Sequence, residues 1–356
     1  MTKMMDKNLS QTKIITCASY YGTGSSAIGD IVSEFDSVTY TSDYEANFLH
    51  CMYGVSDLEY YLIDNPHRHN SSLALKNFIR LAYATSGNSL FKKNAHYFNN
   101  EWDTHVAEYV RSLYAFSYHS VSFFDSIWLP RWMYYAMQIL KKIFKINFLK
   151  NSKHYSTIIN REEFLKATRT FVSKLLSSLH IKTEFVYIDQ FFPSSHIDQV
   201  SQYVESPVFT FIVDRDPRDL YLLDKYVWKT HMVPTDSAEG FCSWFRKNRI
   251  TQSQEIQQDN VLLIKFEDLI YKYDKTIQNI ISFCGLSLQD RRRHEKSFDP
   301  HKSINNTRLW EMYPESFDDM NYIERELSEY IYPYTEDDVK LFGSIVSDQR
   351  TPSSIF

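Results

Sequence analysis

Residues 14–29 read IITCASYYGTGSSAIG, and this stretch predicts a buried strand that leads through a tight turn into a helix. The first five residues are mostly β-branched and uncharged, as in a buried strand. Gly22 and Gly24 then mark the turn, and Ser25 or Ser26 is expected to cap the helix. Such a turn directs backbone N–H groups and the positive end of a helix dipole toward one point. An anion is the ligand that suits this arrangement.

The composition of the chain indicates which kinds of partner and which cellular compartment to expect. The 356 residues carry 39 Lys and Arg against 44 Asp and Glu, a formal net charge of -5, so no nucleic-acid partner is expected. The four cysteines form no C-x-x-C or Cys/His pattern, so we expect neither disulfides nor a metal site. Residues 1–12 are polar and predict a disordered lead-in without a secretory signal, which favours a cytoplasmic protein.

Strand patterns appear at both ends of the chain and helical patterns fill the middle. Besides the strand at 14–18, runs typical of strands lie at 37–40, 185–189, 208–214 and 261–268. The last three are continuous apolar runs, as in parallel sheets covered on both faces. From about 56 to 180, helical periodicity predicts a large helical insertion. The expected fold class is α/β, a three-layer P-loop-type parallel sheet flanked by helices, within one domain spanning 13–356.

Residues 126–150 form an aromatic and basic segment, SIWLPRWMYYAMQILKKIFKINFLK, with lysines at 141, 142, 145 and 150. Two interpretations stay open. One is peripheral contact with the surface of a membrane, at its inner face. The other, which we favour, is an amphipathic helix that packs over the substrate cleft and keeps its lysines in water.

The glycine turn is compatible with three kinds of ligand site. A Walker loop requires G-x-x-x-x-G-K-[ST], but Asp30 follows the last glycine and the turn holds no lysine. A dinucleotide fingerprint is met by Gly22, Gly24 and Ala27, with Asp43 at a spacing that suits a ribose contact. This pattern keeps an NAD-dependent oxidoreductase open. The third kind is a loop that holds a phosphosulfate.

A second anion-binding motif follows the strand expected at 208–214. Residues 215–219 read RDPRD, so Arg215 lies just past the strand and Arg218 three residues further on. Open α/β sheets bind ligands at the carboxyl ends of their strands, and arginine holds phosphate through two parallel hydrogen bonds. A turn with solvated ion pairs is the alternative. The glycine turn on another strand favours a phosphate site.

With these motifs, the chain resembles the sulfotransferases that use 3'-phosphoadenosine 5'-phosphosulfate (PAPS). Four pieces between residues 14 and 310 carry the resemblance. They are the strand and small-residue loop, RDPRD, the run VLLIKFEDLIYKYDKTIQNIISFCGL at 261–286, and SFDPHKSINNTRLW at 297–310. The chain looks most similar to bacterial members that act on surface glycans.

The resemblance implies a PAPS-dependent carbohydrate O-sulfotransferase that needs no metal. Its implied acceptor is a hydroxyl of capsule, lipopolysaccharide or a lipid-linked sugar, and its nucleotide product is 3'-phosphoadenosine 5'-phosphate. The loop would bind the 5'-phosphosulfate and the RDPRD motif the 3'-phosphate. Residues 297–310, which we call the late segment, would fold over the nucleotide. The implied contacts are Tyr21, Gly22, Thr23, Gly24, Ser25, Ser26, Ala27, Arg215, Arg218, Lys302, Ser303 and Asn306.

Three positions depart from the pattern of the family. Gly22 stands where the family usually has a lysine or arginine, so another cation must meet the charge of the transferred group. Lys225, Lys302 and Arg308 are the candidates. Leu223 replaces the serine that usually shares the 3'-phosphate. The histidine base that many members carry after the third strand has no counterpart in YIDQFFPS.

A carboxylate is therefore the expected general base. Glu45 is the first candidate, because its loop would open onto the same sheet edge as the glycine turn; a cap for a helix beginning near Ala46 is the equal alternative. Asp189, at the tip of the third strand, is the second. Because of Gly22 and Leu223, a nucleotide- or glycan-binding protein without catalysis also stays open.

Overall fold

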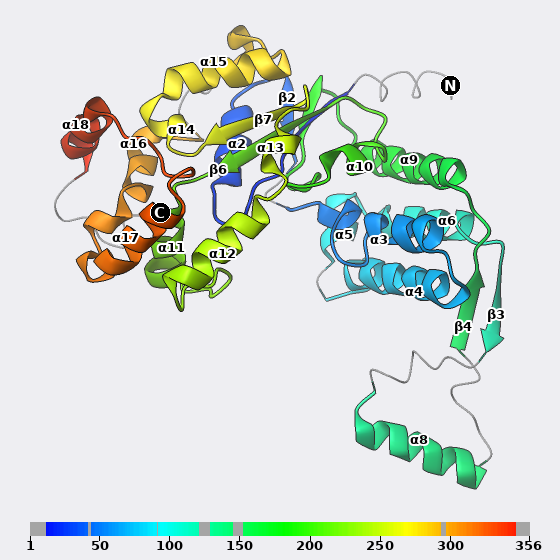
Figure 1. The fold of residues 1–356 in the computed structure, drawn as a ribbon. Helices are drawn as coiled ribbons and strands as arrows, with labels where there is room; N and C mark the ends of the chain where they lie inside the picture. The colour runs from blue at the N-terminus through cyan, green and yellow to red at the C-terminus, as the bar shows by residue number, and fades with distance from the viewer. Residues whose placement is uncertain are drawn as a thin grey trace. The chain divides into compact units, whose positions relative to one another are not determined.

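The computed structural model describes residues 12–41, 44–90, 92–120, 129–144, 152–292 and 297–346 (Figure 1). The chain divides into two compact units. The sheet unit consists of Met1–Asn47 and His180–Phe356, and the helical unit is Phe48–Leu179. The helical insertion expected over about 56–180 corresponds to most of the helical unit. The expected division into a lead-in and a single domain stays a prediction.

Five parallel strands form the sheet of the sheet unit. They are β1 (Lys13–Cys17), β2 (Val38–Tyr40), β5 (Phe185–Tyr187), β6 (Val208–Asp214) and β7 (Val261–Lys265), in the order β2-β5-β1-β6-β7. Each neighbouring pair runs parallel; Ile15 of β1, for example, pairs with Tyr187 on one side and Phe209 on the other. The parallel α/β sheet predicted from the apolar runs is confirmed.

β1 is the strand at which the winding of the sheet reverses. From β1 the chain builds β2 and β5 on one side and then crosses to β6 and β7 on the other. Such a reversal leaves a crevice at the carboxyl ends of the strands, where open α/β sheets bind ligands. Numbered by their occurrence in this sheet, the strands read 2-3-1-4-5. Dinucleotide-binding sheets instead begin 3-2-1, so the order differs from theirs.

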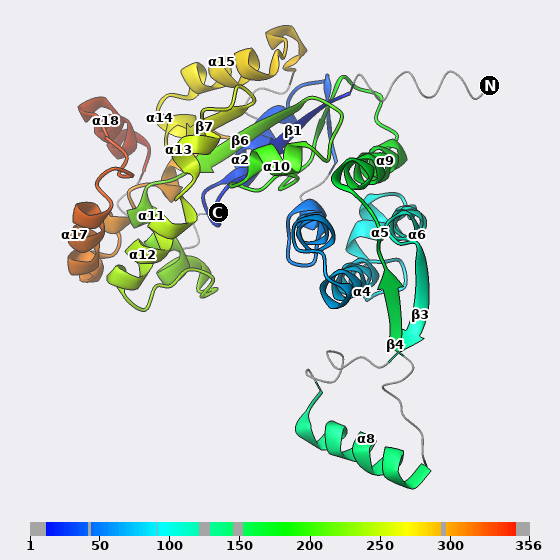
Figure 2. The ribbon, with the colours of Figure 1, turned by 45° about the vertical axis from the view of Figure 1, so that its right-hand side comes forward.

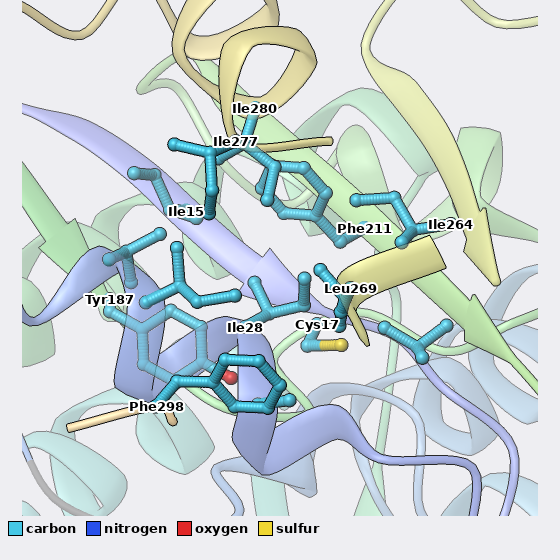
Figure 3. Close-up of a cluster of buried hydrophobic side chains, with 14 of the residues drawn as sticks. Ile15, Cys17, Ile28, Tyr187, Phe211, Ile264, Leu269, Ile277, Ile280 and Phe298 are labelled. Atoms are coloured by element: carbon cyan, nitrogen blue, oxygen red, sulfur yellow. The ribbon is translucent and has the colours of Figure 1, made fainter. Parts of the chain in front are cut away.

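The helices of the sheet unit follow its strands. In chain order they are α2 (Ser25–Val32), α10 (Ile197–Ser201), α11 (Pro217–Leu222), α12 (Ala238–Asn248), α13 (Gln252–Glu255), α14 (Asp268–Tyr271), α15 (Tyr273–Cys284), α16 (Pro300–Ser303), α17 (Phe317–Glu326) and α18 (Glu336–Ile345). One face of the sheet carries the main apolar core, in which Ile15 and Phe211 of the strands meet Ile28 of α2 and Ile277 of α15 (Figure 3).

The opposite face of the sheet is buried as well. Ile14 of β1 and Ile212 of β6 point to this face and are almost fully buried. Asp214 lies on the same face, and its carboxylate binds Arg249 at the end of α12 and Gln252 of α13. Figure 2 shows the ribbons of α12, α13 and β6. Helices therefore cover both faces, which confirms the expected three-layer arrangement.

The helical unit is built around aromatic packing. Its described α-helices are α3 (Val55–Glu59), α4 (Arg68–Ala84), α5 (Lys93–Tyr97), α6 (Trp102–Ser112), α8 (Arg131–Phe144) and α9 (Arg161–Ser178). Phe171 of α9 stacks on Tyr109 of α6 with ring centroids 4.5 Å apart, and Trp102 stacks on Phe98 at 5.7 Å. An antiparallel hairpin, β3 (Phe116–Ser120) with β4 (Ser152–Ser156), was not predicted. β3 is almost entirely exposed and β4 is mostly half-buried, so no apolar run marks them.

The structure bears on the expectations for residues 126–150, for membrane-spanning helices and for the cysteines. None of the residues of α8, the helix within 126–150, is buried, which is at odds with packing over a cleft. Residues 126–128 and 145–150 lie outside the described residues, as does Asp43. Within the described ranges, every helix is too short or too polar to cross a lipid bilayer. The four cysteines are unpaired, and all but Cys51 are buried.

The buried pair of Asp214 and Arg249 gives a first prediction. Both side chains are fully buried, and Nη2 of Arg249 lies 2.7 Å from Oδ1 of Asp214. Burial raises the pKa of Asp214, but the charges of Arg249 and Lys265 outweigh it and lower the pKa to about 2. Arg249→Leu leaves this carboxylate without its main partner, so the free energy of unfolding should fall by about 3–5 kcal/mol in urea denaturation.

The control for this prediction is Arg325→Leu, which removes an exposed arginine paired with Glu326. Its free energy of unfolding should change by less than about 1 kcal/mol, since exposed ion pairs contribute little. Equal effects of the two substitutions would contradict a structural role for the buried pair.

Candidate functional site

The turn after β1 brings the main chain unusually close to aromatic side chains. Gly22 has a φ of +71° and Gly24 a φ of +100°, in the left-handed region that favours glycine. A Cβ on Gly22 would lie 2.7 Å from the ring of Trp228, and a Cβ on Gly24 would lie 2.6 Å from the ring of Phe266. Both glycines are therefore required by conformation and by space.

Helix α2 begins at the end of this turn without a side-chain cap. Gly24 occupies the N-cap position, and the helix starts at Ser25. The expectation that Ser25 or Ser26 caps the helix is thus wrong, because both serines already lie in its first turn. Since no side chain satisfies them, the first amides of α2 suit an external anion.

A cavity of about 280 Å³ lies beside the glycine turn. Its volume is near the lower end of the roughly 300–1,000 Å³ that is typical of small-molecule sites. The residues predicted as contacts that line it are Gly22, Gly24, Ser25, Ser26, Ala27, Arg215, Ser303 and Asn306. The glycine turn, the residue after β6 and the late segment were singled out separately in the sequence. The structure brings all three to one cavity.

Arg215 is the cation of this cavity. Its side chain is buried, Nη2 donates to the carbonyl oxygen of Asn306, and the guanidinium lies 4.5 Å from the centre of the Phe266 ring. Burial lowers the pKa of Arg215, whereas Asp219 and Glu267 act to raise it. Its Nε is buried and has no hydrogen-bond partner among the described residues. A guanidinium with an unused N–H beside a cavity suits an oxyanion.

The rest of the RDPRD stretch holds the structure around this arginine. Arg218 binds both carboxylate oxygens of Asp216, at 3.0 and 2.8 Å, and one of Glu324 at 2.9 Å. It does not line the cavity. Asp219 accepts hydrogen bonds from the backbone N–H groups of residues 308 and 309, at 3.1 and 2.7 Å. Asp219 thereby fixes the end of the late segment.

The other predicted contacts lie outside the lining of the cavity. The hydroxyl of Tyr21 is 2.9 Å from that of Thr230. Thr23 is fully buried, and its hydroxyl donates to the carbonyl of Tyr20 at 2.8 Å. The Lys302 side chain is 87% exposed. The structure therefore places these three around the site rather than in it.

The cation expected to replace the family's basic residue at Gly22 is not found at the cavity. Lys225 pairs with Asp319 at 2.8 Å, and Arg308 pairs with Glu311. Neither these two nor Lys302 lines the cavity, so Arg215 is the single cationic residue among its described lining residues.

Sequence reasoning missed part of the lining. The lining residues that were not named as contacts are Asp30, Leu223, Trp228, Phe266 and Phe298. Trp228 ends the π-helical turn η4 (Leu223–Trp228), and Phe266 directly follows β7. The strand predicted at 261–268 extends past the true end of β7, and this hid Phe266 as a residue at the carboxyl edge. Phe298 lies within the stretch 297–310 that was expected to fold over the nucleotide, although it was not named as a contact, whereas Trp228 carries no local signal.

Both candidate bases lie at the carboxyl edge of the sheet. The N–H of Ala46 donates to the carbonyl of Asp189 at 2.9 Å, so the loop after β2 contacts the end of β5. The Asp189 side chain is largely buried and accepts a hydrogen bond from Tyr187 at 2.9 Å, whereas Glu45 is exposed. Neither carboxylate lines the cavity. The identity of the base stays a prediction.

Two further buried carboxyl groups lie near Arg215. Burial raises the pKa of Glu267 to about 8 and that of Asp219 to about 7, and Asp216 adds to both shifts. Oε1 of Glu267 accepts the N–H of Asp216 at 2.9 Å, while Oε2 has no hydrogen-bond partner among the described residues. Near neutral pH Glu267 is therefore largely protonated. Glu267 then offsets the positive charge of Arg215 less than an ionised carboxylate would.

This shift predicts that Glu267→Gln flattens the dependence of stability on pH. An acid whose pKa is 4.5 before folding and about 8 after it holds its proton more tightly when folded. Wild-type stability then falls as the pH rises through this window. Glutamine does not ionise, so the variant lacks this loss. The free energy of unfolding of the variant minus that of the wild type should therefore rise by about 3 kcal/mol from about pH 5 to pH 8. Urea denaturation across this range measures the difference.

The matched control is Glu239→Gln, at an exposed position on α12. Its profile should run parallel to that of the wild type. A parallel profile for Glu267→Gln as well would show that Glu267 is not protonated in the folded protein.

Comparison with known proteins adds likenesses of fold. No protein-family model and no curated protein matches the chain. Among solved structures, the chain is similar to the sulfotransferase domain of the olefin synthase of Synechococcus PCC 7002. The two chains are 14% identical, the match covers 95% of this chain and 96% of that chain, and the TM-score is 0.38. It is also similar to retinol dehydratase in complex with androsterone and the inactive cofactor PAP, with 12% identity, coverage of 93% and 85%, and a TM-score of 0.34. Likeness at this level assigns no reaction to the chain.

Proposed function

We propose that the chain is a sulfotransferase that moves the sulfuryl group of PAPS to a hydroxyl of a carbohydrate. The observation that carries the proposal is the cavity at the reversal of the sheet, which the start of α2, Arg215 and the late segment line together. PAPS bears a phosphosulfate on one side of its ribose and a phosphate on the other, so it needs anion donors from two elements of the fold. The cavity offers both.

The lining residues fit this donor in their chemistry. The uncapped amides of α2, with the hydroxyls of Ser25 and Ser26, suit the phosphosulfate. Arg215 suits the 3'-phosphate, because its buried Nε lacks a partner among the described residues. Trp228 and Phe298 supply apolar aromatic surface that suits the purine ring.

The residues of the site would act through position and charge. When bound, PAPS supplies a sulfur centre with a phosphate as its leaving group. By analogy with phosphoryl transfer, the amides and hydroxyls of the loop stabilise the charge that develops on the transferred and leaving oxygens. A carboxylate takes the proton of the acceptor hydroxyl as the new oxygen–sulfur bond forms. Glu45 is our first candidate for this role, and Asp189 is the second.

A carbohydrate acceptor is supported by cavities within the helical unit. One of about 520 Å³ and one of about 860 Å³ share Ile158, Ile159 and Glu163 in their lining. The larger one presents Tyr118 and Tyr155 together with hydroxyl, amide and charged side chains. Aromatic faces beside hydrogen-bonding groups suit sugar rings. We propose that the acceptor is a capsule, lipopolysaccharide or lipid-linked sugar, modified in the cytoplasm.

A nucleotide- or glycan-binding protein without catalysis is the second candidate. It is favoured by the presence of Arg215 as the single cation among the described lining residues. Tight nucleotide binding, with no release of 3'-phosphoadenosine 5'-phosphate across a broad panel of acceptors, would identify it. An NAD-dependent oxidoreductase is less well supported, because the strand order differs from that of dinucleotide-binding sheets.

Arg215→Ala tests the nucleotide site. Loss of a charged hydrogen-bonding partner should weaken binding of 3'-phosphoadenosine 5'-phosphate by about 10- to 100-fold. Adenosine 5'-phosphate lacks the 3'-phosphate, so its affinity should change by less than about twofold. Isothermal titration calorimetry measures both affinities, with the exposed Arg325→Ala as a control. Equal losses for the two nucleotides, or a preference of the wild type for NAD, would refute the assignment.

Glu45→Gln tests the choice of base. If Glu45 takes the acceptor proton, turnover should fall by at least about 100-fold while nucleotide affinity stays unchanged. The assay follows labelled sulfate from PAPS into extracts of capsule or lipid-linked sugars, with Asp189→Asn measured beside it. Near-normal turnover of Glu45→Gln, together with a large loss in Asp189→Asn, would transfer the role to Asp189.

A further inference from the structure

Helix α8 presents its side chains to solvent to an extent that no other described α-helix does. Among the described α-helices, α8 alone has no buried residue. The Trp132 side chain is 70% exposed and the Ile143 side chain 65%. Large apolar groups in water are unfavourable, and a contiguous group of them marks an interaction surface.

The apolar side chains of α8 gather on one side of the helix. Trp132, Ile139 and Ile143 are spaced by seven and four residues and lie along one line. Met133, Leu140 and Phe144 have the same spacing and form the adjacent line. Together these two lines make a continuous apolar face, which we call the α8 apolar face.

The other side of α8 is polar, and all of its charged residues are basic. Arg131, Lys141 and Lys142 lie there with Gln138, and the sequence of the helix, RWMYYAMQILKKIF, contains no acidic residue. The whole chain has a net charge of -5, so α8 is a local concentration of positive charge on an acidic protein. An anionic surface would therefore attract this helix rather than the protein as a whole.

We propose that α8 is an interfacial helix that binds the chain to the surface of an anionic lipid bilayer. A strongly amphipathic helix, with tryptophan and aliphatic residues on one face and lysine and arginine on the other, is the type that lies in the plane of the bilayer interface. The fourteen residues of α8 would reach about 21 Å, less than the roughly 30 Å of a hydrocarbon core. The helix therefore lies on the bilayer, with the α8 apolar face in the acyl region and the basic side chains at the headgroups.

This inference does not depend on the proposed function. Lipid binding is measured on the full chain without nucleotide or acceptor, so its failure would leave the nucleotide site untouched. If both proposals hold, α8 brings the enzyme to the surface at which a lipid-linked sugar is presented.

The test is flotation of the full-length protein with vesicles. One set of vesicles is phosphatidylcholine, and the other is phosphatidylcholine mixed with phosphatidylglycerol. The wild type should float with the anionic vesicles, and rising salt should reduce the bound fraction. Lys141→Gln combined with Lys142→Gln should weaken binding by roughly 30-fold, since each basic residue near such a surface contributes about 1 kcal/mol. Ile139→Glu combined with Ile143→Glu should weaken binding by more than about tenfold.

A matched control tests whether these effects belong to α8. Ile250→Glu replaces another highly exposed isoleucine, outside α8, and should float like the wild type. Circular dichroism should show the same melting temperature for all variants, because the changed side chains are exposed. The proposal is overturned if the wild type binds neither set of vesicles, or if the Ile139 and Ile143 variant floats undiminished. It is also overturned if sedimentation velocity shows an α8-dependent dimer in place of lipid binding.

Discussion

The close approach of the main chain at Gly22 and Gly24 to Trp228 and Phe266 is the constraint on which the candidate site depends. Either glycine with a Cβ would collide with an aromatic ring. Only a turn without side chains lets the start of α2 come against the segments that follow β6 and β7. The amides of α2 and the guanidinium of Arg215 then line one cavity, although they lie almost two hundred residues apart in the chain.

The charged residues of the RDPRD stretch serve either the candidate ligand site or the structure around it. Arg215 lines the cavity, whereas Arg218 is held by Asp216 and Glu324. Asp219 holds the backbone of the late segment through two N–H groups. A buried carboxylate beside a cationic site would weaken its attraction for anions if it were ionised. The raised pKa of Glu267 lessens this conflict near neutral pH, while Asp219 and Asp216 still act on Arg215.

The sheet and the centre of the site could be predicted because their signals are local. Continuous apolar runs mark buried parallel strands, and Arg215 directly follows one of them. The hairpin of β3 and β4 escaped prediction because β3 is exposed, β4 is only partly buried, and neither strand buries an apolar row. Trp228 escaped because it reaches the cavity only through tertiary packing. Arg218 was predicted as a contact, but its partner Glu324 lies 106 residues further along the chain and no local pattern reveals that pair.

The same packing explains why position 22 is occupied by a glycine rather than by the cation that the sequence resemblance led us to expect. A side chain at position 22 would be attached to a backbone with a φ of +71°, and its Cβ would lie only 2.7 Å from the side chains of Leu220 and Trp228. Lysine is therefore excluded by geometry, and the charge of a bound anion must be met by other donors. Backbone N–H groups can take this role, because fixed dipoles in a site shielded from water stabilise developing charge without reorganisation. The uncapped first turn of α2 is placed to supply them, and Arg215 supplies the one positive charge among the described lining residues.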